Sequence, residues 1–175
     1  MCSSDLPFTH IGGIIIGVFT PLLTGSAAVL MEAWTPQAST ELIARHRITL
    51  GNGAPAIHTA LLAEARANPE AYATIRAFPS GGSTKPPQLH DDLMAAVPGS
   101  VGITSGYGMT EAPIVSQTDV EAPDASKRDG EGTPTRGVTM KFAESGEIVV
   151  QGPQIMRGYV RSEEHTSELQ SRGLI

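Results

Sequence analysis

The residues with the clearest chemical potential form one hexapeptide, Gly106-Tyr107-Gly108-Met109-Thr110-Glu111. Its two glycines carry no Cβ, so the backbone can turn tightly there and approach a ligand closely. The aromatic ring of Tyr107 offers a flat face on which a purine can stack. The hydroxyl of Thr110 and the carboxylate of Glu111 can serve a phosphate group and its Mg²⁺, which prefers carboxylate and phosphate oxygens. These residue types predict a nucleotide site, although a plain surface turn flanked by glycines has a similar composition.

Four further segments, in a fixed order along the chain, raise the specificity of this prediction. The hexapeptide resembles the adenine- and phosphate-binding loop of the adenylate-forming superfamily, which includes acyl-CoA synthetases, peptide-synthetase adenylation domains and luciferases. The other segments resemble its Pro-x-x-His-x-Gly-Gly, Ser-Gly-Gly-Ala, Gly-x-Pro-x-x-Gly and Gly-Glu-Ile-x-Val-x-Gly…Gly-Tyr motifs. They are Pro7–Gly13, Ser80–Ser83, Gly132–Gly137 and Gly146–Tyr159. Within the superfamily, the chain is most similar to the acyl-CoA ligase branch, with cyclohexanecarboxylate-type and medium-chain acid ligases as the nearest suggestion.

The resemblance implies a two-step ligase reaction. A carboxylate attacks the α-phosphate of ATP, which releases pyrophosphate and leaves an acyl-adenylate, and a thiol then takes the acyl group. Chemistry of this kind depends on positioning and charge neutralisation more than on acid–base groups of the protein. The expected cofactors are ATP or AMP, Mg²⁺ and coenzyme A, and the expected substrate is a small-molecule carboxylic acid.

The resemblance also implies roles for individual residues. Glu111 is expected to bind Mg²⁺, and Thr110 to hold a phosphate oxygen. His10 is expected where the acyl chain and its carboxylate enter, although a histidine beside a glycine pair can equally be a capping or a core residue. Tyr107 is expected to stack on the adenine. The residues expected to line the nucleotide are Gly81, Gly82, Ser83, Gly106, Tyr107, Gly108, Met109 and Thr110.

Several features depart from the family pattern. Ser83 stands where the family usually has alanine, and Ser105 stands where many members carry glutamine. The phosphate loop with its lysine should precede Pro7, the ribose-binding aspartate should follow Val160, and a C-terminal domain with a second lysine should come later. We therefore expect an internal fragment of an enzyme that is inactive as the isolated chain.

Both ends of the chain match the translation of one sequencing adapter. Residues 161–171 correspond to one strand of a widely used oligonucleotide, and residues 1–6 correspond to its reverse complement read from a GTG start. We therefore interpret residues 1–6 and 161–175 as an artefact and residues 7–160 as the fragment of an AMP-binding domain. The alternative is a genuine polar tail.

Composition limits the classes of partner. The net charge of −6 and the lack of a basic stripe with interleaved aromatics argue against nucleic acid. The single cysteine, Cys2, lies in the interpreted artefact, so it says nothing about redox compartment. Residues 11–31 carry no charge and are long enough for a membrane span, but Pro21 and four glycines interrupt them. We expect no integral membrane span there, but a buried helix through Leu23 and a strand over residues 27–31, in a cytoplasmic protein.

The remaining pattern predicts alternating strands and helices, and therefore an α/β domain with a parallel sheet, in which ligands lie at the carboxyl ends of strands. Helices are expected from Thr35-Pro36 to near Arg47 and from Pro86-Pro87 through Val97, strands over 48–50, 74–78 and 101–104, and a hairpin over 138–151. Another helix is expected between these two, ending at Asn68, with an apolar stripe formed by Ile57, Leu61, Leu62 and Ala65. Residues 119–136 are expected to form a surface loop in which Lys127-Arg128-Asp129 is solvated. His46, His58 and His90 lack metal-ligand spacing and are expected to be surface or packing residues.

Two other functional classes stay open on these residues. One is a non-enzymatic nucleotide-binding protein that retains only the adenine and magnesium loop. The other is a membrane protein built around residues 11–31.

Overall fold

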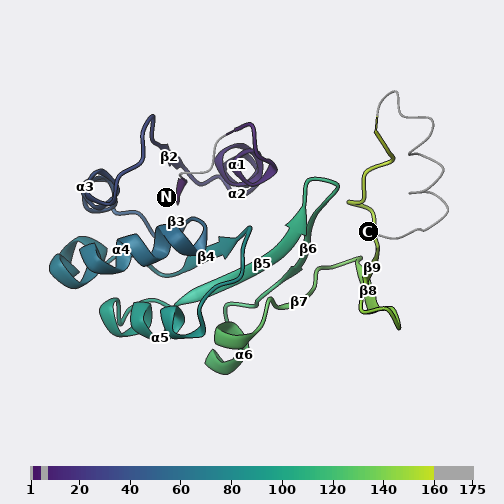
Figure 1. Ribbon diagram of the computed structural model, residues 1–175. Helices are drawn as coiled ribbons and strands as arrows, with labels where there is room; N and C mark the ends of the chain where they lie inside the picture. The colour runs from purple at the N-terminus through teal and green to yellow at the C-terminus, as the bar shows by residue number, and fades with distance from the viewer. Residues whose placement is uncertain (1, 5–7, 160–175) are drawn as a thin grey trace.

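The computed structural model describes residues 2–4 and 8–159, so the predicted adapter-derived tail at residues 161–175 lies outside the described part. Strands and helices alternate along the chain, and the helices lie against an extended sheet (Figure 1). The sheet has a three-stranded part in the order β2-β1-β3 and a four-stranded part in the order β4-β5-β6-β7, which two isolated bridges connect. The strands are β1 (Cys2–Ser4), β2 (Ala28–Leu30), β3 (Leu50–Asn52), β4 (Phe78–Gly81), β5 (Ile103–Met109), β6 (Ala112–Gln117) and β7 (Thr133–Pro134).

The sheet is parallel as far as β5. β1 pairs in parallel with β2 and β3, and β4 pairs in parallel with β5. Main-chain hydrogen bonds from Gly51 N to Ala77 O (3.2 Å) and from Gly53 N to Pro79 O (3.1 Å) join β3 to β4. β6 and β7 then continue the sheet in antiparallel pairing. The predicted α/β fold with a parallel sheet is confirmed, and the structure adds two antiparallel strands beyond it.

β1 lies among the residues that we interpret as adapter-derived. Cys2 is the register partner of both Ala28 in β2 and Leu50 in β3. A strand ladder is formed by main-chain N–H and C=O groups, so this pairing does not depend on which side chains the strand carries. The origin of residues 1–6 therefore stays a prediction.

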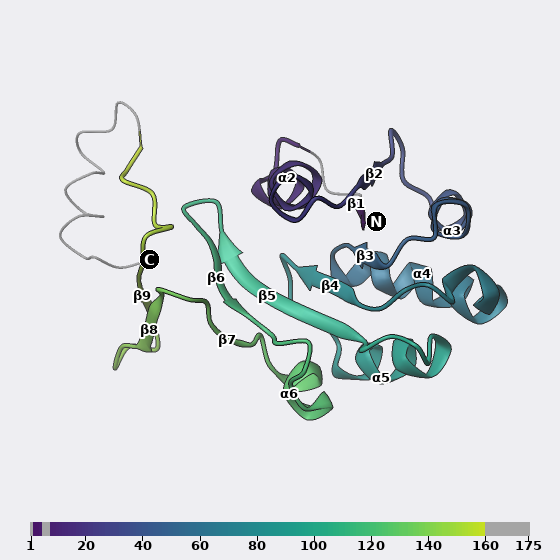
Figure 2. The same cartoon turned by 180° about the vertical axis from the view of Figure 1, so that it is seen from behind.

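The helix expected near the N-terminus is present, but it is not buried. α1 (Ile11–Ile14), the π-helical turn η1 (Ile15–Phe19) and α2 (Thr20–Thr24) follow one another without a break and end at Gly25, whose φ is 67°. η1 contacts β1 and β2, as the view from behind shows (Figure 2). The far side faces solvent, and Leu22 and Leu23 are 75% and 85% exposed. The prediction of burial was wrong because, among the described residues, neighbours pack on only one side of this helix.

The three other predicted helices are present close to their predicted positions, as α3 (Pro36–His46), α4 (Pro55–Ala67) and α5 (Pro87–Ala96). The structure adds the 3-10 turn η2 (Pro69–Tyr72) and the short helix α6 (Asp124–Asp129), which were not predicted. α3 starts as its sequence predicts, because Thr35 Oγ1 accepts a hydrogen bond from Ala38 N (3.1 Å) and proline occupies the first helical position. α4 packs between α3 and α5. No helix in the described ranges is both long and apolar enough to cross a membrane.

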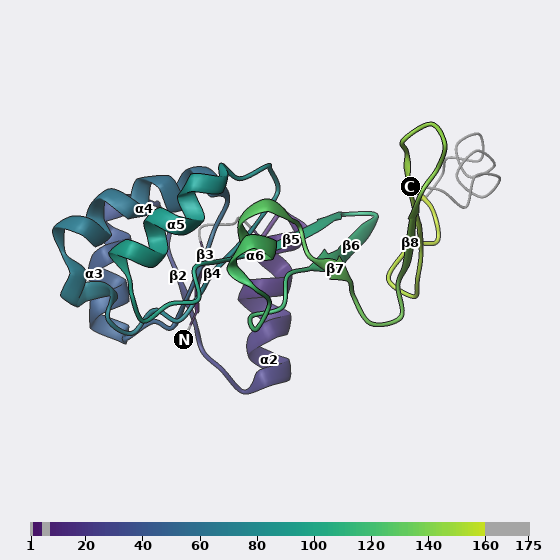
Figure 3. The ribbon, with the colours of Figure 1, turned by 90° about the horizontal axis from the view of Figure 1, so that it is seen from below.

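The main hydrophobic core lies between these helices and the parallel strands. Phe78 on β4 and Ile103 on β5 are fully buried with Ile43 of α3 and Leu93 of α5. Tyr72 is also fully buried, and its hydroxyl is 2.8 Å from Thr40 Oγ1, so its polar end is satisfied. Figure 3 shows α3, α4 and α5 gathered at one end of the molecule, away from the β8–β9 hairpin.

Three strands lie later in the chain than predicted. The expected strands over residues 48–50, 74–78 and 101–104 are observed as β3, β4 and β5, each of which runs on into glycines. Glycine was interpreted as a turn residue, but a strand also needs it where another group approaches the backbone closely. Gly108 in β5 is one such position, because a Cβ there would lie 3.0 Å from Ala112 O of β6.

The C-terminal hairpin is confirmed, whereas the preceding loop is more ordered than expected. β8 (Thr139–Phe142) pairs in antiparallel with β9 (Ile148–Gln151). The predicted loop over residues 119–136 contains α6 and β7. Lys127, expected to be solvated, is only 4% exposed, and its Nζ donates to Val101 O and Val120 O (both 3.3 Å). The prediction of a solvated Lys127 was wrong because its ammonium is held by one carbonyl from a distant segment, that of Val101, and one from the nearby Val120.

Candidate functional site

Two predicted nucleotide-binding segments meet side by side in the sheet. Gly81 at the end of β4 is the register partner of Gly106 in β5, and Ser80 is the register partner of Ser105. A Cβ on Gly81 would lie 2.9 Å from Gly106 O, closer than real Cβ contacts allow. The sequence therefore builds a flat strip of backbone at the carboxyl end of the parallel strands, where ligands bind in open α/β sheets.

The residues after Gly81 lie at the surface. Gly82 adopts a φ of 84°, a left-handed conformation that favours glycine, and nothing lies within 4 Å of where its Cβ would be. Ser83 is exposed. This turn leaves its main-chain groups accessible, which suits a contact made through the backbone.

The second segment is a hairpin, not a loop. Gly106, Tyr107, Gly108 and Met109 belong to β5, and Thr110-Glu111 forms the tight connection to β6. The prediction of a loop was wrong because Gly108 is packed against β6, where a Cβ would lie 2.5 Å from Ile114 N. Tyr107 and Met109 are half-buried against a small apolar cluster formed by Ala112, Val115 and Val150.

An irregularity in β6 shapes this hairpin. The register shifts between the pairs Tyr107–Ser116 and Met109–Ala112, and Ile114 in the shifted stretch has a φ of 53°. A branched residue in this region is strained, and such strain often occurs at functional sites. The carbonyl of Ile114 accepts hydrogen bonds from Thr135 Oγ1 (2.8 Å) and Gln154 Nε2 (3.4 Å). The bulge therefore connects the hairpin to two of the other motif segments.

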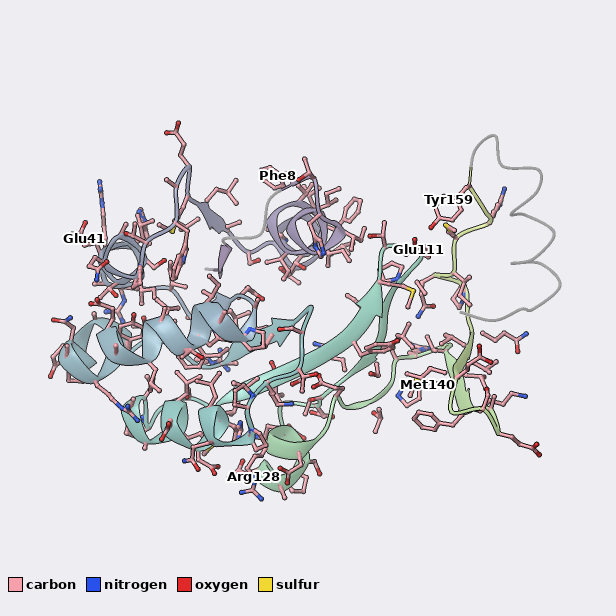
Figure 4. The ribbon with its side chains drawn as sticks, viewed as in Figure 1. Phe8, Glu41, Glu111, Arg128, Met140 and Tyr159 are labelled. Atoms are coloured by element: carbon pink, nitrogen blue, oxygen red, sulfur yellow. The ribbon has the colours of Figure 1, made fainter. Side chains whose placement is uncertain are left out.

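Glu111 lies at the tip of the hairpin, where its side chain and its main chain are both held (Figure 4). The hydroxyl of Tyr159 donates a hydrogen bond to Glu111 Oε1, and Met156 N donates to Glu111 O (2.8 Å). The bond from Tyr159 lowers the pKa of the Glu111 carboxyl, and the same bond raises the pKa of the phenol. Tyr159 was recognised only as part of a motif, and no local signal in the sequence links it to Glu111.

His10 is exposed and caps a helix. It is the N-cap of α1, and its Nδ1 accepts a hydrogen bond from Gly12 N (3.0 Å). This is the alternative role that a histidine before a glycine pair allows. Its expected place beside the acyl group stays a prediction.

The Gly132-Thr133-Pro134 segment is fixed tightly against β6. Gly132 has a φ of 83°, and a Cβ there would overlap the main chain of Gln117. Lys85 is 5% exposed and donates from Nζ to Gly130 O (2.7 Å), which ties the Ser80–Ser83 turn to this segment. Sequence reasoning gave Lys85 no role, because a lysine after a polar turn normally indicates exposure.

The carboxylate of Glu111 at the hairpin tip suits a cation whose other ligands are the phosphates of a bound nucleotide and water. No group of three or more His, Cys, Asp or Glu side chains in residues 2–4 and 8–159 could hold a metal ion. Mg²⁺ is typically bound by one or two carboxylates together with substrate phosphates and water. Glu111 as a single carboxylate therefore fits Mg²⁺ that arrives with a nucleotide, and does not form a site of its own.

The fold is that of the N-terminal domain of adenylate-forming α/β enzymes. VinN in complex with L-aspartate superimposes with a TM-score of 0.84 and 26% identity, covering 95% of this chain and 43% of that protein. The o-succinylbenzoate coenzyme A synthetase MenE from Bacillus subtilis, solved with ATP and a magnesium ion, superimposes with a TM-score of 0.80 and 25% identity, covering 95% and 36%.

The chain belongs to the AMP-binding enzyme family, whose profile matches residues 1–160. It is 31% identical over 175 residues to 4-coumarate–CoA ligase 3 of Oryza sativa subsp. japonica, covering 92% of this chain and 31% of that protein. It is 30% identical over 174 residues to a feruloyl-CoA synthase of an Amycolatopsis species, covering 93% and 35%. The chain therefore spans about a third of the length of these relatives.

Proposed function

We propose that this chain is the adenine- and magnesium-binding segment of an ATP-dependent carboxylic acid–CoA ligase. The observation that carries the proposal is the register pairing of Gly81 with Gly106, because it joins two separate motifs into one strip of bare backbone. Such a strip lets a flat purine lie close to the main chain. The membership of the chain in the AMP-binding enzyme family supports the same ligand.

In this proposal the chain binds and orients ATP. The main chain at Gly81, Gly82 and Ser83 lies along one side of the adenine, and Tyr107 stacks on the base with Gly106 and Gly108 beside it. Met109 packs the hairpin against its apolar cluster, and the Thr110 hydroxyl donates to a phosphate oxygen. His10 lies toward the acid. Each of these groups positions a reactant, which is the main requirement of phosphoryl transfer.

Glu111 holds Mg²⁺ in this proposal. Its carboxylate lies at the tip of the hairpin and is ionised at neutral pH, since the hydrogen bond from Tyr159 lowers its pKa. When bound, the cation neutralises charge on the phosphates during the attack of the acid on the α-phosphate. Coenzyme A then accepts the acyl group in the whole ligase.

The substrate of the proposed ligase is a carboxylic acid, and the motifs and the relatives suggest different classes of acid. Sequence motifs favour cyclohexanecarboxylate-type or medium-chain acids, whereas the relatives named above act on 4-coumarate and ferulate. A hydrophobic pocket distinguishes two acids that differ by one methylene by only about 1–3 kcal/mol, so several candidate acids must be tested directly as substrates.

The isolated chain is proposed to bind nucleotide without turning it over, since it spans about a third of the relatives' length. Calorimetry of the purified 175-residue chain with AMP tests binding. Release of pyrophosphate from ATP in the presence of 4-coumarate, ferulate, cyclohexanecarboxylate or octanoate tests catalysis. AMP binding that Gly81→Ala abolishes, with no pyrophosphate release, supports the proposal. Absence of AMP binding contradicts it for this chain.

The parent ligase is tested through its gene. We expect the source DNA, sequenced across the regions that encode residues 1–6 and 161–175, to encode other residues at both ends. CoA-thioester formation by the protein that this gene encodes then tests the reaction. If that protein binds adenine nucleotides but forms no CoA thioester, the result would instead favour a non-enzymatic nucleotide-binding protein.

A further inference from the structure

A tyrosine from a distant part of the chain holds the proposed Mg²⁺ carboxylate. The Tyr159 hydroxyl donates its hydrogen bond to Oε1 of Glu111, and Figure 4 shows the two residues on adjacent segments. We propose that Tyr159 is a positioning residue for Glu111, fixing one carboxylate oxygen so that the other is presented to a divalent cation. This inference rests on the proposed function, because it takes Glu111 as the cation-binding carboxylate.

The segment that carries Tyr159 is itself fixed to the hairpin. Three residues before Tyr159, Met156 N donates to the main-chain carbonyl of Glu111 (2.8 Å). Gln154 Nε2 donates to Ile114 O (3.4 Å), and Ile155 packs against the apolar cluster around Ala112 and Val115. Residues 152–159 therefore hold both the backbone and the side chain of Glu111, so the phenol reaches the carboxylate from a defined position.

A glutamate at a hairpin tip needs such a partner if it is to bind a cation in one orientation. Glu111 follows Met109, the last residue of β5, by two positions, and Met109 pairs with Ala112 across the turn. A free glutamate side chain loses rotamer entropy when it is fixed. A hydrogen bond that fixes it beforehand removes part of this cost from cation binding. Groups that orient metal-ligating carboxylates in this way typically change metal affinity by about 10–100-fold when removed.

The electrostatics agree with this role. A phenol that donates to a carboxylate stabilises its ionised form, and the pKa of Glu111 is lowered mainly by Tyr159. Tyr159 is 51% exposed, so replacing it with phenylalanine removes the hydroxyl without opening a core cavity. The variant Tyr159→Phe therefore isolates the hydrogen bond.

The first experiment asks whether the pair exists in the absence of nucleotide. The full chain, labelled with ¹³C at glutamate, is compared by NMR at neutral pH, without nucleotide or metal, as wild type, Tyr159→Phe and Tyr72→Phe. The last is the matched control, because it removes a tyrosine hydroxyl that bonds Thr40 far from the site. We expect the ¹³C resonance of the Glu111 carboxylate to shift in Tyr159→Phe and to stay unchanged in Tyr72→Phe. An unchanged Glu111 resonance in Tyr159→Phe would overturn the inference.

The second experiment asks what the pair does. Mn²⁺ is titrated into the chain by electron paramagnetic resonance in the presence of saturating ATP. Tyr159→Phe is expected to weaken Mn²⁺ affinity about tenfold, while ATP affinity measured with EDTA stays the same. Equal or tighter Mn²⁺ binding by the variant overturns the positioning role and leaves the proposed function intact.

Failure of the proposed function gives a different result. If wild type binds no ATP, the proposed function is contradicted, whereas the Glu111–Tyr159 pair is still decided by the NMR comparison, which uses no nucleotide. A Glu111 resonance that shifts in Tyr159→Phe then supports the pair, and a resonance that does not shift overturns it.

Discussion

The carbonyl oxygen of Gly106 lies 2.9 Å from the position that a Cβ would occupy on Gly81. These residues are register partners in neighbouring parallel strands, and each belongs to a different motif. The contact is asymmetric, because a Cβ on Gly106 would meet nothing closer than Ser116 O at 3.7 Å. Close packing therefore requires glycine at position 81, whereas at position 106 a residue with a Cβ would also fit.

Gly81→Ala is expected to lower the free energy of unfolding by about 1–3 kcal/mol, because the added methyl group must push the two strands apart. The same displacement should abolish or strongly weaken AMP binding. Urea unfolding and calorimetry measure the two effects. Gly106→Ala is the matched control for stability, and a loss as large as that of Gly81→Ala would contradict the packing argument.

His58 should make stability depend on pH. The ring is fully buried beside Phe78, and burial lowers its pKa from about 6.5 to about 4. The unfolded chain therefore binds a proton that the folded chain excludes, so this stabilisation is complete above pH 6.5 and is lost as pH falls toward 4. By pH 5 the loss should be on the order of 2 kcal/mol.

Urea unfolding at several pH values, with wild type and His58→Gln, measures the contribution of His58. The variant should lose less stability between pH 7 and pH 5 than wild type. Part of the dependence should persist, because burial also lowers the pKa of His90. An identical pH dependence in both proteins would show that His58 does not titrate in this way.

Lys127 should contribute to stability despite its charge. Its Nζ donates to Val101 O and Val120 O and forms an ion pair with Asp124 (3.2 Å). Lys127→Met keeps the volume but leaves two carbonyls without this donor, so we expect a loss of about 1–3 kcal/mol. Thermal unfolding measures it. Lys141→Met, at an exposed position on β8, is the control and should change stability by less than about 0.5 kcal/mol.

The exposed side of α2 should promote self-association. Leu22 and Leu23 are 75% and 85% exposed, and Phe19 one turn earlier is 51% exposed. Contiguous apolar surface of this kind favours association. The double variant Leu22→Glu/Leu23→Glu should reduce the apparent mass in light scattering at high concentration and leave the unfolding midpoint nearly unchanged. Phe142→Glu, 71% exposed on β8, is the control for a single apolar side chain elsewhere. Unchanged association in the double variant would exclude this face.

Local sequence determined the helices and the identity of the motifs. The Thr35-Pro36 start of α3 and the apolar stripe of α4 depend on residues a few positions apart, and the structure has both elements where they were predicted. The family was also evident from the sequence, because its motifs are short and ordered.

Tertiary structure decided what those elements touch. Glycines expected in turns lie inside β3, β4 and β5, and at Gly81 and Gly108 it is strand pairing that places main-chain atoms close against them. Lys127 is buried because α6 folds its ammonium onto carbonyls from other segments. Tyr159 meets Glu111 across 48 positions of sequence. Local patterns carry information about neighbours within a few residues, whereas these contacts depend on which strands pair and how the chain returns to them.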